Sequence, residues 1–318
     1  MNKEPRRIDV HNHIIPSEYL KELAGIGITE SLGRSFPEWS AEKTLAVMDA
    51  NGIRAAVTSL SSPGVWFGDA SFARRAARLC NEASARLVGD RPARFGAFAS
   101  LPLPDTAASL EELAYALDTL RLDGVVVLSN VGGTYIGDGM HEELYAELNR
   151  RRVVVYVHPT DPAAGNPLGK EIPTYLMEVT FDTARAIFNL LYRGVLERYP
   201  DIRWIFSHAG GALPYLAWRV SLGQFVLPDA GSAVPRGVPY YLKKLYYDTG
   251  LSANPYVFRT LRELVEPSQI LFGTDYPFAP EILSAETVKG LRAYDGFSPD
   301  DLEKIEFRNA EELFPRLG

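Results

Sequence analysis

The sequence predicts one (β/α)8 (TIM) barrel over residues 1–318, with a loop and helix insertion after the first strand. Eight short, mostly apolar segments recur along the chain, helical patterns separate them, and no long polar linker divides the chain. Strands that alternate with helices form parallel βαβ units, and eight such units in about 300 residues suffice for this barrel. The competing fold is a doubly wound open sheet, but no Gly-x-Gly-x-x-Gly turn follows the first strand.

The elements follow from local patterns. Residues 14–39, interrupted by glycines and prolines, predict the irregular insertion. Ser40 is expected to cap the next helix, and later helices begin near Asp69 and Asp105. Further helices are expected at 138–151, before Tyr199, and at 280–291 and 299–313. The predicted strands cover residues 8–13, 55–60, 95–101, 124–128, 153–158, 203–208, 245–248 and 270–275.

Composition narrows the function classes. Hydrophobic residues make up 46% of the chain and charged residues 23%, as in globular proteins with an ample core. The net charge of −7 provides no basic footprint for nucleic acid. The single cysteine, Cys80, excludes an intramolecular disulfide and is expected in the core. The polar N-terminus and the lack of an apolar run of about 18 residues predict a cytoplasmic protein that does not enter membranes.

Two histidines mark the end of the first predicted strand. Side chains of a strand alternate between its faces with period 2, so His11 and His13 point the same way. Two imidazoles on one face can hold one divalent metal ion, and zinc keeps a position open when it does chemistry. A His-x-His pair also occurs by chance, so this pair alone leaves a metal site and a solvated strand end equally open.

Other polar residues occupy the carboxyl ends of later predicted strands. His158 ends the fifth strand, His208 the sixth and Asp275 the eighth, so four of the five histidines stand at strand ends. In a barrel these ends converge on one mouth, where catalytic residues collect. The convergence predicts a metal site at that mouth. The fifth histidine, His141, is expected to be a solvated residue at a helix start and no ligand.

These motifs carry a resemblance to a known family. The chain resembles the amidohydrolase superfamily, within it the branch of aminocarboxymuconate-semialdehyde decarboxylase and its aromatic-acid decarboxylase relatives. The motifs are Ile8-Asp9-Val10-His11-Asn12-His13, Val157-His158-Pro159, Phe206-Ser207-His208-Ala209-Gly210-Gly211 and Phe272-Gly273-Thr274-Asp275-Tyr276-Pro277. A closer similarity, to the 6-methylsalicylate decarboxylase group, rests on Leu60-Ser61-Ser62-Pro63-Gly64, Leu101-Pro102-Leu103-Pro104 and Phe181-Asp182-Thr183-Ala184-Arg185.

The resemblance implies roles for the strand-end residues. It implies His11, His13, His158 and Asp275 as metal ligands and His208 as an acid/base, with Asp275 also able to pass a proton to the ring carbon. Relatives with two metals carry a lysine at the end of strand four, whereas this chain has Leu128-Ser129-Asn130 there. One divalent metal ion is therefore expected, with zinc preferred and manganese possible for such a ligand set.

Four further residues are candidates for binding or positioning. In the resembling decarboxylases an arginine at the place of Arg219 binds the substrate carboxylate from the neighbouring subunit, which implies a homodimer; a surface helix arginine is the alternative. Asp248 could orient an imidazole or cap the turn that follows it. Trp66 and Phe278 could wall a pocket for an aromatic ring, or simply pack in the core.

The function expected from these residues is a metal-dependent, non-oxidative decarboxylation. The substrate would be a hydroxylated aromatic (salicylate-type) or related unsaturated carboxylic acid, and the product CO2. The alternative is a metal-dependent hydrolase of the same fold, a lactonase or amidohydrolase, because both activities use the same ligands. A barrel kept only for binding or as a scaffold is a further alternative, against which the intact ligand set argues.

Overall fold

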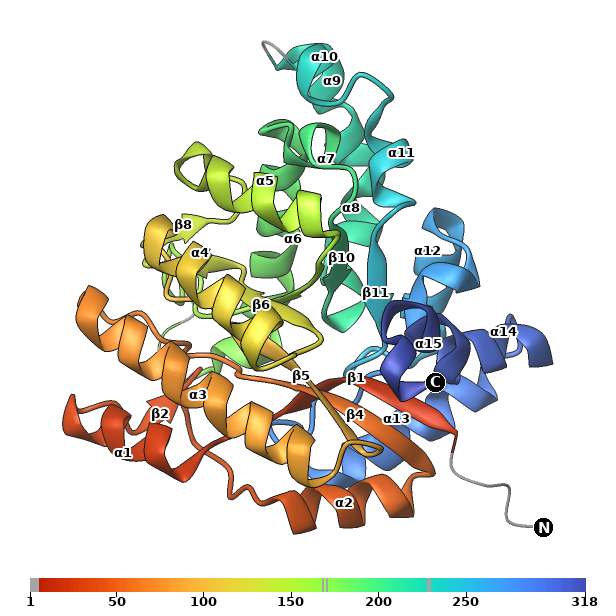
Figure 1. Ribbon diagram of the computed structural model, residues 1–318. Coiled ribbons are helices and arrows are strands. Elements are labelled where there is room, and N and C mark those ends of the chain that lie inside the picture. The colour runs from red at the N-terminus through yellow and green to blue at the C-terminus, as the bar shows by residue number, and fades with distance from the viewer. Residues whose placement is uncertain (1–5, 168, 170, 228–229) are drawn as a thin grey trace.

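The computed structural model describes residues 6–167, 169, 171–227 and 230–318, and it confirms the predicted barrel. Eight parallel strands lie side by side in chain order, with helices between them (Figure 1). Most contain β-branched or aromatic residues, which suit a buried parallel sheet. The strands are β1 (Arg7–His13), β4 (Ile53–Ser59), β5 (Phe95–Ser100), β6 (Gly124–Leu128), β9 (Val154–His158), β10 (Arg203–Phe206), β11 (Tyr246–Asp248) and β12 (Ile270–Leu271).

The barrel closes between β1 and the segment that follows β12. The Asp275 amide donates to the His11 carbonyl at 2.7 Å, and the His13 amide donates to the Tyr276 carbonyl at 2.8 Å. Asn12 and Tyr276 form a parallel bridge. The first and last strands of the chain are therefore held together at the carboxyl end of the barrel.

Apolar side chains fill the inside of the barrel. Phe98 stacks on Tyr156 with a centroid distance of 5.2 Å and an interplanar angle of 9°. Phe314, from the C-terminal segment, packs against Phe98 and belongs to the same cluster. The amino end of the barrel is thus closed by packing, and the carboxyl end is left for function. Strand residues in the cluster are Ile8, Val10, Ala55, Val57, Phe98, Val126, Val154, Tyr156, Ile205 and Leu271.

The helices begin where the sequence predicts. The Ser40 hydroxyl accepts from the Lys43 amide, the Asp69 carboxylate from the Ser71 and Phe72 amides, and the Asp105 carboxylate from the Ala108 amide. Cys80 lies buried, as predicted. The longer helices are α2 (Ala41–Ala50), α3 (Ala70–Asp90), α4 (Thr106–Ala114), α5 (Glu142–Arg151), α6 (Glu178–Tyr192), α8 (Leu213–Ser221), α12 (Pro255–Leu264) and α13 (Glu281–Ala293).

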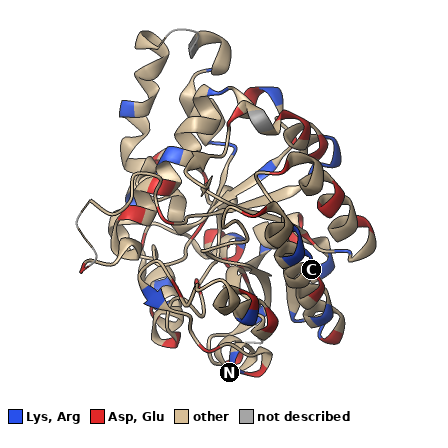
Figure 2. Ribbon diagram, turned by 90° about the vertical axis from the view of Figure 1, so that its left-hand side faces the viewer, with Lys and Arg blue, Asp and Glu red and all other residues tan. Residues whose placement is uncertain are grey.

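The insertion after β1 contains ordered structure. It holds α1 (Ser17–Gly25) and a hairpin of β2 (Glu30–Ser31) and β3 (Arg34–Ser35). Charges of both signs are interspersed over the outer helices in the view of Figure 2. Within the described chain, no helix combines the length and the apolar character that a bilayer crossing needs.

Three sequence predictions need correction. The strands predicted at 203–208 and 270–275 end at Phe206 and Leu271, because the backbone soon turns into the left-handed region at His208 (φ 54°) and Asp275 (φ 66°). His141 is buried rather than solvated, with 5% of its surface exposed, and its Nδ1 lies 2.9 Å from the Thr106 hydroxyl. A single turn of 3-10 helix before α5 brings it inward.

Candidate metal centre

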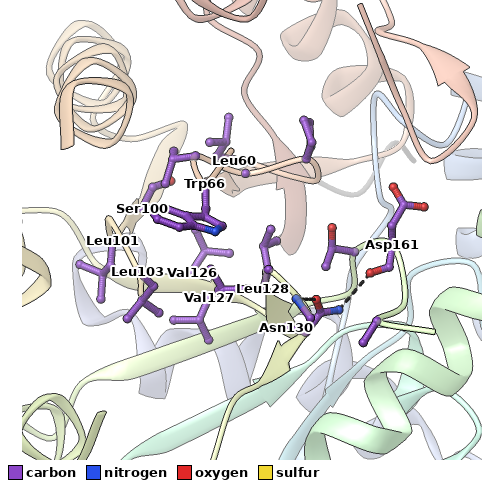
Figure 3. A pocket seen from close by; sticks show the side chains of 18 of the residues that line it. Leu60, Trp66, Ser100, Leu101, Leu103, Val126, Val127, Leu128, Asn130 and Asp161 are labelled. Carbon is purple, nitrogen blue, oxygen red and sulfur yellow. Dashed lines mark hydrogen bonds between the residues drawn. The ribbon is translucent and has the colours of Figure 1, made fainter. Parts of the chain in front are cut away.

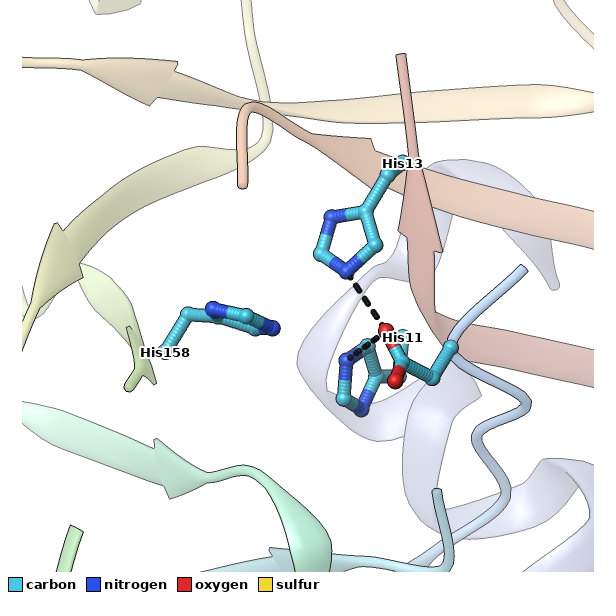
Figure 4. Close-up of side chains that lie close together, drawn as sticks. His11, His13 and His158 are labelled. Carbon is cyan, nitrogen blue, oxygen red and sulfur yellow. Dashed lines mark hydrogen bonds and ion pairs between the residues drawn. The ribbon is translucent and has the colours of Figure 1, made fainter. Parts of the chain in front are cut away.

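Four side chains meet at the carboxyl end of the barrel. His11 and His13 come from β1, His158 ends β9, and Asp275 follows β12. One ligand atom from each lies within 4.8 Å of the others, and all four side chains are buried. Figure 4 shows the three imidazoles turned toward a common point. The period-2 argument therefore places both β1 histidines on the same face, as predicted.

The distances fit a shared cation. Asp275 Oδ1 lies 3.1 Å from His11 Nε2 and 3.0 Å from His13 Nε2. Two atoms that each bind one zinc ion at about 2.1 Å lie about 3.0–3.4 Å apart, for angles of about 90–110° between the two bonds. His158 Nε2 is buried and has no hydrogen-bond partner among the described residues, which costs free energy unless another group satisfies it. A divalent cation between these atoms would do so, and three nitrogens with one carboxylate suit such an ion.

The electrostatics favour coordination at three of the four side chains. Burial lowers the pKa of His13 and His158, so both imidazoles are neutral and can offer a lone pair. Burial would raise the pKa of Asp275, but the contacts with His11, His13 and His208 hold it well below its usual range. Burial alone would lower the pKa of His11, but the carboxylates of Asp248 and Asp275 raise that pKa to about 10. Binding of a cation would release this proton.

Asp248, at the end of β11, takes both roles that the sequence left open. Its Oδ2 lies 3.0 Å from His11 Nδ1 and accepts a hydrogen bond from the Tyr156 hydroxyl at 3.0 Å. Its Oδ1 accepts from the amides of His208, at 3.0 Å, and Gly250, at 2.8 Å. One buried carboxylate therefore faces the ring of one candidate ligand and also secures the turn that carries His208.

His208 lies beside the four-residue cluster rather than within it. Its Nε2 is 3.5 Å from Asp275 Oδ2, and its ring centroid is 4.8 Å from that of His11. Its Nδ1 is buried without a hydrogen-bond partner among the described residues. His208 thus reaches the carboxylate of the cluster and keeps one ring nitrogen unused.

A cavity of about 530 Å³ opens onto the cluster. Phe278 lines it, with its ring edge-on to His13 at a centroid distance of 5.4 Å. Arg34, in β3 of the insertion, is the one lysine or arginine among the described lining residues. Sequence reasoning missed Arg34, because an arginine in an irregular Gly/Pro-rich segment carries no periodicity that would place it. The signal that the sequence offered was the position of the insertion, which directly follows the His-x-His strand and so starts at the candidate site.

Two predicted binding residues lie elsewhere. Trp66 lines a second cavity, described below, and does not line the cavity at the cluster. Arg219 lies exposed on α8 and does not line the cavity either. Neither residue is in place to touch a molecule bound at the cluster within its own subunit.

Comparisons with known proteins agree with this geometry. A protein-family model described as amidohydrolase matches residues 8–316. The 6-methylsalicylic acid decarboxylase of Penicillium expansum is 34% identical over 316 residues, covering 98% of this chain and 97% of the relative. The motif resemblance found in the sequence is thereby confirmed.

Solved structures share the whole fold. One described as amidohydrolase II matches with a TM-score of 0.91 at 30% identity, over 97% of this chain and 99% of that chain. The structure of 2,6-dihydroxybenzoate decarboxylase complexed with 2,6-dihydroxybenzoate matches with a TM-score of 0.81 at 26% identity, over 98% and 99% of the two chains. The barrel fold is therefore common to all three.

Replacing His13 by alanine removes one of the four converging donors. We expect His13→Ala to purify without stoichiometric metal and to lose activity, because three donors hold the ion less tightly and one coordination position becomes open. Elemental analysis of the purified variant measures this. His141→Ala is the matched control and should keep its metal; full metal content in His13→Ala would contradict the site.

Replacing Asp248 by asparagine tests the positioning of His11. We expect Asp248→Asn to bind metal roughly 10–100-fold more weakly, since an amide cannot both accept from Tyr156 and face His11 as a carboxylate does. Competition with a chelator measures the affinity, and thermal unfolding checks the fold. Asp123→Asn, at the other end of the barrel, should match the wild type. Equal affinity in all three proteins would show that Asp248 serves the turn alone.

Proposed function

The chain belongs to the amidohydrolase family, and we propose that it is a metal-dependent, non-oxidative decarboxylase of a hydroxylated aromatic acid of the salicylate type. One observation carries the proposal: a buried three-histidine, one-carboxylate cluster opens into a cavity that holds one guanidinium and an aromatic wall. The named decarboxylase relatives support it. Because ligands come from the first and the last strand, we also propose that residues 1–318 act as one domain.

The proposal includes one divalent cation, zinc first and manganese as the alternative. His11, His13, His158 and Asp275 would hold it. Once bound, such an ion polarises a carboxylate or phenolate oxygen as a Lewis acid. The remaining steps fall to side chains of this chain, and no organic cofactor enters them.

Decarboxylation requires that a proton reach the ring carbon that bears the carboxylate. As the proton binds that carbon, the bond to the carboxylate breaks, CO2 leaves, and the electron pair of the broken bond restores the aromatic ring. We assign the proton transfer to His208 and Asp275, which are 3.5 Å apart and both line the cavity. An imidazole can accept a proton at one ring nitrogen and donate one from the other, which suits this task.

Arg34 and Phe278 would orient the acid. A guanidinium pairs with a carboxylate through two parallel hydrogen bonds, and Arg34 supplies that group at the cavity wall. Phe278 offers a ring for packing against the substrate ring. Trp66 would contribute only through the neighbouring cavity.

A homodimer remains part of the proposal. Large apolar side chains are exposed on and after α8, among them Tyr215 at 84%, Trp218 at 76% and Phe225 at 76%. Such patches mark protein–protein contact surfaces. Arg219 lies within this patch, so a second copy could receive its guanidinium. Sedimentation velocity of the purified protein would check the oligomeric state, and a cytoplasmic location stays a prediction of the composition.

The direct test is release of CO2. We expect the metal-loaded protein to convert 6-methylsalicylic acid or 2,6-dihydroxybenzoic acid to CO2 and a phenol, because the ortho hydroxyl donates electron density to the carbon that is protonated. Benzoic acid lacks that hydroxyl and should release none. Hydrolysis of lactones or amides without CO2 release from any acid would favour the hydrolase alternative.

His208 separates metal binding from catalysis. We expect His208→Ala to keep the metal and to lose turnover, because the residue stands outside the four-donor cluster but borders the reacting group. Metal content and kcat are measured on the same preparation. Loss of the metal in this variant would assign His208 to the ligand set instead.

Arg34 tests recognition of the substrate carboxylate. We expect Arg34→Gln to raise KM by roughly 10–100-fold, the effect of losing a hydrogen bond to a charged group worth about 1.5–3 kcal/mol. Arg86→Gln, an exposed arginine of α3, is the matched control. An unchanged KM in Arg34→Gln would leave the carboxylate to another group.

A further inference from the structure

A second cavity of about 380 Å³ lies at the same end of the barrel as the metal-site cavity. Figure 3 shows the side chains that line it. It opens where the chain leaves β4, β5, β6 and β9. A volume of this size falls within the range of small-molecule sites. Its apolar walls come from Leu60, Pro63, Val65, Trp66, Leu101, Leu103, Leu128, Val131 and Ala163.

A thin polar wall divides the two cavities. Ser61 lines the metal-site cavity, whereas Leu60 and Pro63 line the second one. Ser62 and Thr160 are joined by a hydrogen bond of 2.9 Å between their hydroxyls, and both are buried. The two cavities are therefore neighbours along residues 60–63 and 159–160.

Glycines keep the walls of the second cavity in place. A Cβ on Gly132 would lie 2.9 Å from Trp66 Nε1, and a Cβ on Gly64 would lie 2.6 Å from Leu128 Cδ1. Both glycines have positive φ, at 56° and 75°. The backbone at these two glycines thus lies closer to the Trp66 indole and the Leu128 side chain than a residue with a Cβ would allow.

The two cavities differ in charge. Asp161 is the one ionisable residue among the described residues that line the second cavity, whereas Arg34 faces the metal-site cavity. The Asn130 amide is already used, because Nδ2 donates to the Asp161 carbonyl and Oδ1 accepts from the Gly133 amide. The second cavity therefore offers an apolar interior with the exposed carboxylate of Asp161 at its rim, where Oδ1 also accepts from the Thr174 hydroxyl, and no lysine or arginine among its described lining residues.

We propose that the second cavity binds a neutral phenol, the class of product left when a hydroxylated aromatic acid loses its carboxylate. The proposal rests on the proposed function, because that reaction turns an anion into an uncharged ring next to this wall. Apolar surface and the indole of Trp66 would hold the ring, and the phenolic hydroxyl would lie toward the rim, on the side of Asp161. The substrate anion would be excluded from the second cavity, because the Asp161 carboxylate repels it and burial of an unpaired charge costs free energy.

Fluorine NMR tests this on the metal-loaded protein. Labelling with 5-fluorotryptophan gives one signal for each of the four tryptophans, and Trp66→Phe assigns the signal of Trp66. We expect 3-methylphenol to shift that signal in a saturable way and 3-methylbenzoate to leave it unmoved. Ala163→Phe, which narrows the rim, should abolish the shift, whereas Ala164→Phe, at the adjacent exposed position outside the lining, should keep it.

The outcomes separate the two proposals. No shift with 3-methylphenol, or an equal shift in Ala163→Phe, would overturn the phenol site. An equal response to 3-methylbenzoate would overturn its selectivity for the neutral molecule. The titration needs no turnover, so a protein that binds 3-methylphenol here yet releases no CO2 from any acid would retain the phenol site and lose the proposed reaction.

Discussion

The same contact closes the barrel and brings two residues of the candidate metal centre together. The Asp275 amide bonds to the His11 carbonyl, so the backbone link that joins the last strand to the first also sets one ligand beside another. Asp9 strengthens this link, because its buried carboxylate accepts from the amide and hydroxyl of Thr274 and from the His11 amide. A small displacement of the β12 end relative to β1 would move the Asp275 carboxylate away from the imidazoles.

Two residues at the mouth of the barrel have strained backbone, which contacts with neighbouring residues stabilise. His208 and Asp275 both have positive φ without being glycine, which costs about 1–3 kcal/mol each. The His208 amide is held by Asp248, and the Asp275 amide by His11. Strain at these two positions turns the chain sharply after β10 and β12, so that both side chains point into the mouth of the barrel.

Sequence reasoning reached the parts that depend on repeated patterns. The alternation of strands and helices predicted the barrel, and the parity of His11 and His13 with the strand-end positions of His158 and Asp275 predicted the cluster. It could not reach features set by loops. Arg34 and the separation of Trp66 from the cluster depend on the paths of the β1 and β4 loops, and the burial of His141 depends on one 3-10 turn. Asp248 could be given two roles but not assigned, because both require its exact neighbours in space.

The span between the ligands has a consequence for biosynthesis. His11 emerges from the ribosome early and Asp275 late, because Asp275 is 264 positions after His11 in the sequence. Phe314, after α15 (Asn309–Leu313), also packs into the interior of the barrel. A nascent chain therefore cannot form the complete cluster until the residues through Asp275 have been synthesised. A cation that needs all four donors can bind only after that point.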